Sequence, residues 1–485
     1  MAITFSILKK GEKYNEAVYF IQKASQIAHF PELNLHKEII LEKIAAEKPD
    51  TLVTYNGKKK ITVAFYFSKE KEHSYRLESI RAFGNRIGKL LNAQKQKEVA
   101  LLGLSHAFNR ADLFAFLEGL ELGSYQFLKY KSKKSELNTL NKITLENGVL
   151  SETELKEFVQ LMEAVSITKD LVNEPVITLD AVKFSKEMEK LGKANGFSVE
   201  VLNKAQIKAL NMGGLLGVNM GSDIPPTFNI LTYKPRGAAN AQPLVLVGKG
   251  VVFDTGGYSL KVGGVMQTMK CDMAGAAAVV GAITAIAKNK LPVYVVGLIP
   301  ATDNRINGSA LVVDDVITMH DGTTVEVQNT DAEGRLILAD ALAYAKKYKP
   351  ELVIDLATLT GAAAAITGQY GSAVMGNESR YKKELIETGE ETYERLAEMP
   401  FWREYDDLLK SDIADIRNIG GATGGAITAG KFLARFTDYN WVHIDIAGPA
   451  FLKDAKDYHH KGASGVGVRL LYQFAKKMAL KKKRK

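Results

Sequence analysis

The N-terminal part of the chain alternates between short apolar runs and longer amphipathic stretches. Residues 59–67 and 98–104 are rich in β-branched and aromatic side chains, a composition that favours strands. Residues 75–94 place apolar side chains at the spacing of a helix. This alternation predicts a smaller N-terminal α/β domain over residues 1–148.

A longer amphipathic stretch follows this domain. Residues 149–172 carry apolar side chains at helical spacing, and Ser151 with Glu154 forms the pattern of a capping box. We therefore expect a connecting helix between two domains. A length of 485 residues agrees with two domains, because it exceeds what one ordinary core holds.

The stretch 173–475 repeats the order strand, loop, helix. It contains three apolar runs typical of strands that are buried on both faces, at residues 243–248, 293–299 and 351–357. Helical patterns that start at Gly275 and Leu336 alternate with these runs. The pattern predicts a larger α/β/α domain around a mostly parallel central sheet. Ligands are then expected at the carboxyl ends of its strands.

The net charge of +9 is unevenly distributed. Residues 1–150 carry 24 Lys+Arg against 16 Asp+Glu, and the basic tail 476–485 carries seven basic and no acidic side chains. The remaining stretch has a net charge of −6. One hypothesis is that the N-terminal domain and the tail bind nucleic acid or another polyanion. The alternative is a solvated surface, which agrees with the lack of a recognised nucleic-acid motif.

Targeting features and cysteine content indicate a cytoplasmic protein. No apolar stretch approaches the roughly 20 residues needed to cross a bilayer, and the first residues lack the features of a signal peptide. We therefore expect a cytoplasmic location and no membrane partner. The single cysteine, Cys271, excludes an internal disulfide framework and a thiolate metal cage.

Three loops next to apolar elements are dense in acidic and basic residues. They contain Lys249, Asp254, Lys261, Asp272, Asp331, Glu333 and Arg335. Asp331 and Glu333 are two positions apart, so in an extended segment both side chains point to one face and repel unless a cation lies between them. Four carboxylates supply the hard oxygen ligands that a pair of divalent ions requires, and such a pair activates water for hydrolysis.

Each of these residues also has an ordinary structural interpretation. Asp272 stands just before a predicted helix, where an aspartate is commonly an N-cap. The acids of an Asp-x-Glu loop are commonly solvated, and a lysine among glycines commonly lies on the surface. The spacing alone leaves a metal site and these ordinary roles open.

At these loops the sequence closely resembles the leucyl aminopeptidase family, the cytosol aminopeptidases. The string NTDAEGRL at residues 329–336 matches the signature of that family, and residues 247–261 and 269–279 resemble its metal-binding segments. Further similar segments lie at residues 170–175, 212–222, 357–362, 441–450 and 462–471. The resemblance implies a metal-dependent aminopeptidase that hydrolyses the N-terminal peptide bond and prefers leucine-like first residues.

The resemblance also implies which residues hold two metal ions. One ion is expected on Lys249, Asp254, Asp272 and Glu333. The other ion, which exchanges more readily, is expected on Asp254, Glu333 and both the side chain and the backbone carbonyl of Asp331. As a ligand Lys249 must be unprotonated, a state that an adjacent dication and burial favour. The ions are expected to be zinc or manganese, with magnesium and cobalt as alternatives.

In the implied mechanism, a water that bridges the metals attacks the first peptide carbonyl, and Lys261 helps to polarise its oxygen. The free α-amine of the peptide substrate binds one metal, which restricts the enzyme to N-termini. Arg335 is similar to a family arginine that holds bicarbonate, the expected general base. The residues that match the pocket for the first side chain are Met269, Thr358, Gly361, Ala447 and Ala450. The resemblance also implies a homohexamer.

Motifs of other enzyme classes fit the sequence less well. Residues 424–432 nearly spell a phosphate-binding loop, but Phe432 stands where magnesium coordination requires serine or threonine. Neither HExxH nor GxSxG occurs in the sequence. One-metal proteases of the first type and serine hydrolases of the second therefore lose support.

Overall fold

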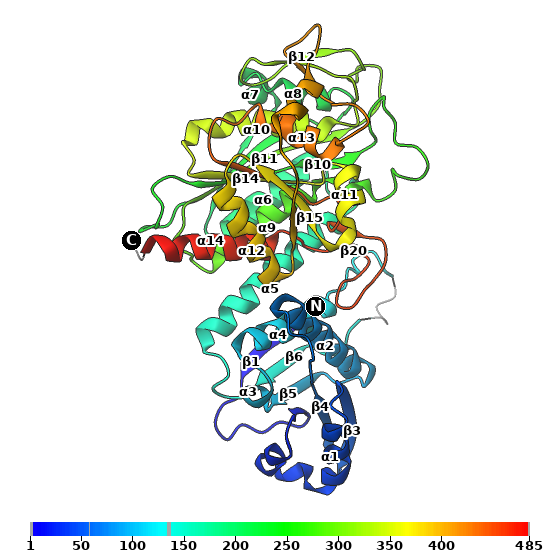
Figure 1. The fold of residues 1–485 in the computed structure, drawn as a ribbon, viewed down its shortest axis with the longest axis vertical. Helices are drawn as coiled ribbons and strands as arrows, with labels where there is room; N and C mark the ends of the chain where they lie inside the picture. Colours follow the sequence, from blue (N-terminus) through cyan, green and yellow to red (C-terminus); the bar gives the residue numbers. More distant parts are fainter. Residues whose placement is uncertain (1–2, 58, 133–136, 484–485) are drawn as a thin grey trace. The chain divides into compact units, whose positions relative to one another are not determined.

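The chain divides into two compact units (Figure 1). The computed structural model describes residues 3–57, 59–132 and 137–483. Unit 1 comprises Met1–Glu163 and Asp454–His460, and unit 2 comprises Ala164–Lys453 and Lys461–Lys485.

The boundary between the units falls within α5 (Glu152–Asn173). The predicted capping box at its start is confirmed. The backbone N of Ser151 donates to Glu154 Oε2 at 2.9 Å, and the backbone N of Glu154 donates to Ser151 Oγ at 3.3 Å. Unit 1 thus extends beyond residue 148 and includes the first half of this helix.

Within the described residues, unit 1 is built on a six-stranded sheet. In spatial order its strands are β1 (Thr4–Ile7), β6 (Lys142–Leu145), β5 (Glu98–Leu102), β2 (Ala17–Phe20), β4 (Lys59–Phe65) and β3 (Asp50–Asn56). Neighbouring strands are parallel except β3 and β4. The strands predicted at 59–67 and 98–104 are confirmed as β4 and β5.

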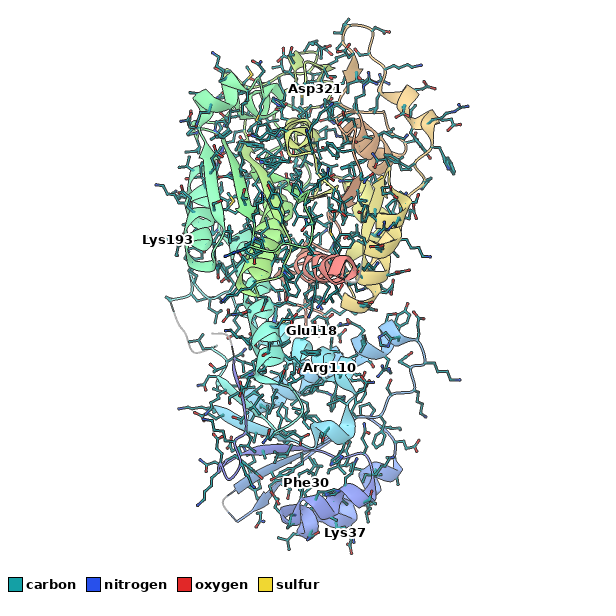
Figure 2. The ribbon with its side chains drawn as sticks, turned by 90° about the vertical axis from the view of Figure 1, so that its left-hand side faces the viewer. Phe30, Lys37, Arg110, Glu118, Lys193 and Asp321 are labelled. Carbon is teal, nitrogen blue, oxygen red and sulfur yellow. The ribbon has the colours of Figure 1, made fainter. Side chains whose placement is uncertain are left out.

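Helices cover both faces of this sheet. They are α1 (Lys37–Ala45), α2 (His73–Ala93), α3 (Leu104–Ala107) and α4 (Arg110–Ser124), with the 3-10 helices η1 (Ala24–His29) and η2 (Pro31–His36). Phe116 of α4 packs on Phe20, with ring centroids 5.2 Å apart, and Ile40 of α1 packs on the opposite face with Tyr19. Figure 2 labels Glu118 on α4. The predicted α/β organisation of this part is confirmed.

A segment from late in the sequence, Asp454–His460, also belongs to unit 1. Asn85 Nδ2 donates to the backbone O of Asp457 at 2.6 Å, and the hydroxyl of Tyr458 donates to Glu78 Oε2 at 2.9 Å. The sequence pattern gave no indication of this return of the chain.

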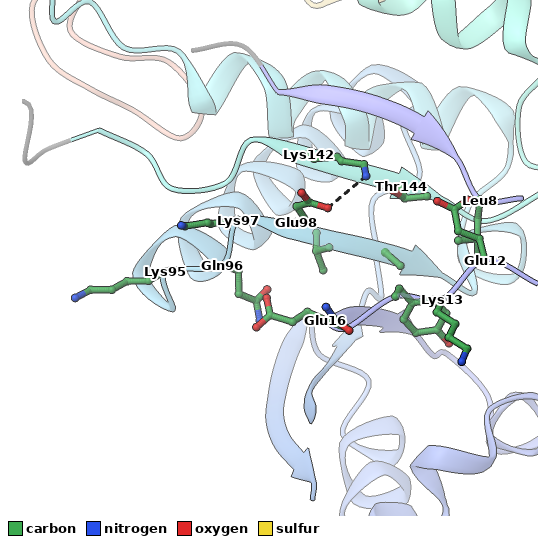
Figure 3. Close-up of a pocket in the computed structure, with 14 residues that line it drawn as sticks. Leu8, Glu12, Lys13, Glu16, Lys95, Gln96, Lys97, Glu98, Lys142 and Thr144 are labelled. Carbon is green, nitrogen blue, oxygen red and sulfur yellow. Dashed lines mark hydrogen bonds and ion pairs between the residues drawn. The ribbon is translucent and has the colours of Figure 1, made fainter. Parts of the chain in front are cut away.

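A cavity of about 540 Å³ opens in unit 1 at the amino ends of β5 and β6 (Figure 3). The charged residues that line it are Glu12, Lys13, Glu16, Lys95, Lys97, Glu98 and Lys142. The two signs nearly balance, so the cavity does not concentrate the positive charge of the N-terminal domain. None of the predicted site residues lines it.

Within the described residues, unit 2 contains a nine-stranded sheet. In spatial order its strands are β16 (Leu396–Glu398), β15 (Ser372–Gly376), β18 (Trp441–Asp445), β14 (Leu352–Ala357), β9 (Leu244–Gly248), β11 (Val295–Asn304), β8 (Thr227–Tyr233) and β7 (Ser198–Leu202), with β10 (Gly250–Asp254) paired to β11. The central strands β18, β14, β9 and β11 run parallel. The mostly parallel sheet is confirmed, and antiparallel pairs lie toward both edges.

The helices of unit 2 are α6 (Ala181–Asn195), α7 (Lys204–Ala209), α8 (Gly213–Asn219), α9 (Ala274–Lys288), α10 (Glu333–Ala345), α11 (Gly361–Thr367), α12 (Ser379–Thr392), α13 (Gly425–Ala434) and α14 (Val468–Lys483). Its 3-10 helices are η3 (Met269–Met273), η4 (Lys346–Tyr348), η5 (Gly368–Tyr370) and η6 (Arg403–Leu409). Its short strands outside the large sheet are β12 (Val316–Thr318), β13 (Thr324–Glu326), β17 (Ile416–Arg417), β19 (Phe451–Leu452) and β20 (Gly462–Ala463). α14 continues through the predicted tail as far as residue 483.

The large sheet is buried on both faces. A Cβ added to Gly297 of β11 would lie 2.6 Å from Ile283 of α9, so α9 packs closely on one face. Leu336 of α10 belongs to the core formed with Val245 and Val247 of β9, whose side chains point to the other face. Two-sided burial explains why the strand sequences are continuously apolar.

One buried helical stretch is as apolar as a membrane span. Met269–Lys288 meets the length and composition of a bilayer-crossing helix, with a mean hydropathy of 1.4. The expectation that no stretch approaches this size is therefore wrong. In the structure, 89% of the apolar window is buried inside the protein, as is typical of a core helix.

The segment that resembles a phosphate-binding loop has another role in the structure. Lys431 lies inside α13, where its Nζ contacts Asp406 Oδ2 at 3.1 Å and faces the ring of Phe401. In the described chain, β17 ends at Arg417 and no strand leads into α13. The strand, loop and helix arrangement that binds phosphate is thus missing here.

Candidate metal centre

Five polar residues stand at the carboxyl ends of neighbouring strands. Lys249 follows β9, Asp254 ends β10, Asn304 ends β11, Thr358 follows β14 and Asp445 ends β18. These strands run parallel, so their ends meet at one edge of the sheet (Figure 1). This edge is where parallel α/β sheets bind ligands.

Lys249 is buried among acidic side chains. Its Nζ lies 2.8 Å from Asp272 Oδ1 and 2.9 Å from Glu333 Oε1, and it donates to the backbone O of Thr358 at 2.9 Å. Burial alone would lower the pKa of Lys249, but the negative charges of Asp272, Glu333 and Asp254 outweigh it and raise that pKa. The interpretation of this lysine as a surface residue is wrong.

Lys261 makes the corresponding contacts with a second pair of acids. Its Nζ lies 2.8 Å from Asp254 Oδ2 and 2.5 Å from Asp331 Oδ1. The backbone N of Gly256 donates to Asp254 Oδ1 at 2.8 Å, and Gly256 has a φ of +87°, a conformation that glycine adopts without strain. This turn lets the loop fold back so that Lys261 faces the acid at the end of β10.

Asp272 does not cap the helix that follows it. It lies within η3, and the residue before α9 is Met273, which makes no side-chain cap. Asp272 Oδ1 instead accepts hydrogen bonds from Lys249 Nζ and Thr358 Oγ1, both at 2.8 Å. The N-cap interpretation is therefore wrong, and the carboxylate points to Lys249.

Asp331 and Glu333 reach this region from a turn and from the start of a helix, which the sequence did not indicate. Residues 330–331 form a turn and Glu333 is the first residue of α10, so the expectation of an extended segment is wrong. Thr330 fixes the turn, because its Oγ1 donates to the backbone O of Gly256 at 2.7 Å and accepts from the backbone N of Ser259 at 2.8 Å.

The acids form a tight and buried cluster. Asp254, Asp272 and Glu333 each present a carboxylate oxygen, and these atoms lie within 4.8 Å of one another. Burial first, and then the nearby charge of Asp254, raises the pKa of Asp331 to about 7 and raises the pKa of Glu333. Burial also raises the pKa of Asp272. A cation among these groups would relieve their repulsion and favour their ionised forms.

The donor set of the cluster fits divalent cations. Glu333 Oε2 is buried and accepts no hydrogen bond from any residue that the structure describes. A buried carboxylate oxygen without a donor is costly, whereas it is a ready ligand for a hard cation. Carboxylates at this spacing, with one amine beside them, therefore suit one or more divalent ions.

Comparison with known proteins identifies the family. A family model described as the catalytic domain of the cytosol aminopeptidase family matches residues 166–472. The chain belongs to the cytosol aminopeptidase family. It is therefore a metal-dependent aminopeptidase, a hydrolase that acts on peptides.

Relatives in the cytosol aminopeptidase family support this identification. A probable cytosol aminopeptidase of Chlorobium limicola is 48% identical over 378 residues, which cover 75% of each chain. One from Clostridium perfringens is 42% identical over 420 residues, which cover 84% of each chain.

Solved structures also support the identification of the family. The bottromycin maturation enzyme BotP in complex with Mn has a TM-score of 0.83 at 29% identity, over 96% of this chain and 100% of BotP. A mutant of tomato leucine aminopeptidase has a TM-score of 0.84 at 27% identity, over 98% of this chain and 96% of that one.

In this member of the cytosol aminopeptidase family, Asn418 orders the signature loop. Its side-chain Oδ1 accepts from the backbone N of Gln328 at 2.8 Å, and its Nδ2 donates to the backbone O of Asn329 at 2.7 Å. Its backbone O accepts from Arg335 Nη1 at 2.7 Å. Arg335 Nε is buried and donates to no acceptor among the described residues. The arginine is thus held at one nitrogen, while the hydrogen-bonding capacity of another is not used by any described residue.

The residues expected to line the side-chain pocket lie on segments around the cluster. Thr358 contacts Asp272 directly, and Met269 begins η3, the 3-10 helix that contains Asp272. Gly361 begins α11. Ala447 and Ala450 follow β18, and the backbone N of Ala447 donates to Asp445 Oδ1 at 3.1 Å.

The sequence patterns missed the polar residues that hold the acids in place. These residues are Asn304, Thr330, Asn418 and Asp445. Asn304 Nδ2, for example, donates both to Asp254 Oδ1 at 2.9 Å and to the backbone O of Thr330 at 3.1 Å. Isolated asparagines and threonines occur throughout the chain. Only their positions in the fold distinguish them: Asn304 and Asp445 end strands, Asn418 follows β17, and Thr330 stands in the turn before α10.

Proposed function

We propose that this enzyme removes leucine-like N-terminal residues from peptides with two divalent metal ions held at the carboxyl edge of the sheet. One observation carries the proposal: Asp254, Asp272 and Glu333 bring carboxylate oxygens within 4.8 Å of one another in a buried site. Buried acids at that spacing repel one another unless cations lie among them.

Each ion is assigned its own set of ligands. The first set is Lys249, Asp254, Asp272 and Glu333, and the second is Asp254, Asp331 and Glu333. The contacts of Lys249 with Asp272 and Glu333 support the first set, and those of Lys261 with two acids support the second. When bound, such ions polarise the peptide carbonyl and lower the pKa of water in the site.

Lys261 is proposed to stabilise the carbonyl oxygen of the first peptide bond. Burial would lower the pKa of Lys261, but Asp254 and the neighbouring acids raise it, so the side chain keeps its proton. A charged N–H donor aimed at that oxygen stabilises the negative charge that develops there. The acidic groups of the site also favour peptide substrates whose α-amine is free, which limits the enzyme to N-termini.

Arg335 is proposed to hold a bicarbonate ion that accepts the proton of the attacking water. The support is its single fixed nitrogen, Nη1, and its buried Nε, which donates to no described residue. Burial lowers the pKa of Arg335 to about 10, which leaves the guanidinium charged at neutral pH. A buried cation with a spare donor is suited to binding an oxyanion.

The pocket for the first side chain is proposed to comprise Met269, Thr358, Gly361, Ala447 and Ala450. These residues are small or apolar, which leaves room for a branched apolar group. Zinc or manganese is proposed as the native ion, and the manganese complex of BotP supports manganese. A cytoplasmic location is proposed from the names of the relatives.

The proposal is tested by hydrolysis of leucine p-nitroanilide before and after treatment with a chelator. Activity should disappear with the metal and return on addition of manganese or zinc. Glu333→Gln keeps the shape of the side chain but removes its charge, so it should lose bound metal and about 100-fold or more of kcat. The exposed Glu189→Gln on α6 serves as a control. Wild-type turnover and metal content in Glu333→Gln would contradict the assignment.

A further inference from the structure

Asp445 is a buried acid that lies outside the metal cluster. It ends β18 and has no exposed surface. Its Oδ1 accepts from the backbone N of Leu359 at 3.1 Å and from the backbone N of Ala447 at 3.1 Å. Its Oδ2 accepts from Thr360 Oγ1 at 2.8 Å. One carboxylate therefore binds two loops that are far apart in the sequence.

The first of these loops leads directly to the metal cluster. Thr358 Oγ1 donates to Asp272 Oδ1 at 2.8 Å, and the backbone O of Thr358 accepts from Lys249 Nζ at 2.9 Å. Leu359 and Thr360, the next two residues, are the ones that bind Asp445. Thr358 is thus held at the cluster by its own hydrogen bonds, and Asp445 holds the two residues that follow it.

The second loop carries the other side of the proposed pocket. Ala447 is bound by Asp445, and the backbone N of Ala450 donates to the backbone O of Ile446 at 3.1 Å. The backbone N of Ile446 donates in turn to Ala357, the last residue of β14, at 2.8 Å. The two loops therefore follow two adjacent strands, β14 and β18, and hydrogen bonds to Asp445 join them.

We propose that Asp445 is a positioning residue that sets the side-chain pocket at a fixed distance from the metal cluster. This inference rests on the proposed function, because it takes the pocket residues from there. Among the described residues, the hydrogen bonds of Asp445 go to Leu359, Thr360 and Ala447 and not to the acids of the cluster. Asp445 acts through Leu359 and Thr360 on one side and Ala447 on the other, so its loss changes which first residues fit more than it changes the hydrolytic chemistry.

Two variants separate this role from simple stability. Asp445→Asn keeps an oxygen for the backbone donors of Leu359 and Ala447 but places an amide NH₂ where Oδ2 accepted from Thr360. Thr360→Val removes the same hydrogen bond from the other side. Thr360→Ser retains the hydroxyl, and with it the cap that Thr360 Oγ1 provides to the backbone N of Ala363 at 3.0 Å, and is the matched control.

The experiment compares kcat and KM for leucine and alanine p-nitroanilides in the metal-loaded enzymes, with metal content and thermal unfolding measured in parallel. Asp445→Asn and Thr360→Val should raise KM for the leucine substrate. The preference for leucine over alanine, as a ratio of kcat/KM values, should fall by about 10-fold, while metal content stays as in the wild type. Thr360→Ser should keep the wild-type preference.

A preference for leucine over alanine that is unchanged in folded Thr360→Val would overturn the inference, as would an equal loss of activity on both substrates. If Asp445→Asn fails to fold, Thr360→Val decides the matter alone. Failure of the proposed function has a different signature. In that case the wild type itself would show no metal-dependent preference for leucine.

Discussion

At the scale of single residues, the position of Lys249 depends on a missing side chain. Gly334 is the second residue of α10, and a Cβ there would lie 2.4 Å from Lys249 Cε and 2.7 Å from its Nζ. The absence of a side chain at Gly334 lets the amine reach Asp272 and Glu333. Lysine can bind a metal only as the neutral amine, and a nearby dication lowers its pKa toward that state.

We predict that Gly334→Ala pushes the amine of Lys249 away from the acids while the protein stays folded. Alanine favours a helix more than glycine does, and the group that must move is a flexible side chain rather than backbone. The displacement of the Lys249 amine should lower kcat/KM by about 100-fold. Steady-state kinetics and metal analysis check this result.

Gly217→Ala in α8 is the matched control, because the nearest atom to its added Cβ would be Ile317 Cγ2 at 3.5 Å, an ordinary contact. It should behave as the wild type. Full activity and full metal content in Gly334→Ala would show that the position of the Lys249 amine beside the acids is not required for hydrolysis.

The sequence revealed the acids of the site more readily than their surroundings. Asp254, Asp272 and Glu333 stood out because acids beside apolar elements are unusual. Lys249 came from the family resemblance alone, since a lysine after a short strand has no distinctive pattern. Asn418 was missed, because its role depends on contacts with residues about ninety positions away in the sequence.

At the scale of elements, the apolar runs predicted where strands lie but not how they are arranged. Burial on both faces makes β9, β11 and β14 continuously apolar, and this signal is local in the sequence. Strand order and the antiparallel pairs toward the edges depend on long-range contacts, which periodicity does not record. For the same reason Glu333 was placed in an extended segment although it opens α10.

α10 also carries a buried acid, Asp340, whose raised pKa predicts a pH-dependent stability. Asp340 accepts hydrogen bonds from the backbone N of Leu215 at 2.8 Å and of His320 at 2.9 Å. Burial raises the pKa of Asp340 to about 7, well above its usual value, so the folded state binds this proton more tightly than the unfolded state. Its contribution to stability is therefore complete below about pH 4 and is lost as the pH rises to about 7.

We predict that Asp340→Asn removes this part of the pH dependence. Urea unfolding of both proteins between about pH 4 and about pH 7 measures the free energy of unfolding. It should decrease less steeply with rising pH in the variant than in the wild type. The readout is the difference in slope, so a uniform loss of stability in the variant does not affect it. Identical slopes would contradict the account.

At the scale of the whole molecule, the first prediction concerns the oligomeric state. We predict that the purified enzyme sediments as a homohexamer, with about six times the subunit mass of 53.2 kDa. The loop after β10 offers apolar surface for such contacts, because Tyr258, Leu260, Val262 and Val265 are 45% to 73% exposed. Sedimentation as a monomer at all concentrations would refute the assembly.

The uneven charge provides a second prediction for the whole molecule. If the basic N-terminal domain and tail bind polyanions, affinity for duplex DNA should fall steeply between low and physiological salt, because binding releases counterions. Acidic and basic side chains nearly balance around the cavity of unit 1, so this cavity is not a strongly positive site for such a ligand. Titration of labelled DNA checks the prediction, and the absence of binding at low salt would eliminate it without affecting the peptidase.

The most direct test of the metal centre is anomalous diffraction from crystals of the manganese-loaded enzyme. We expect two anomalous peaks at the carboxyl edge of the large sheet, one between Lys249 and Asp272 and one beside Asp331, with Asp254 and Glu333 in contact with both. A folded, active and fully loaded enzyme whose peaks lie elsewhere, or whose acids hold no ion, would contradict it.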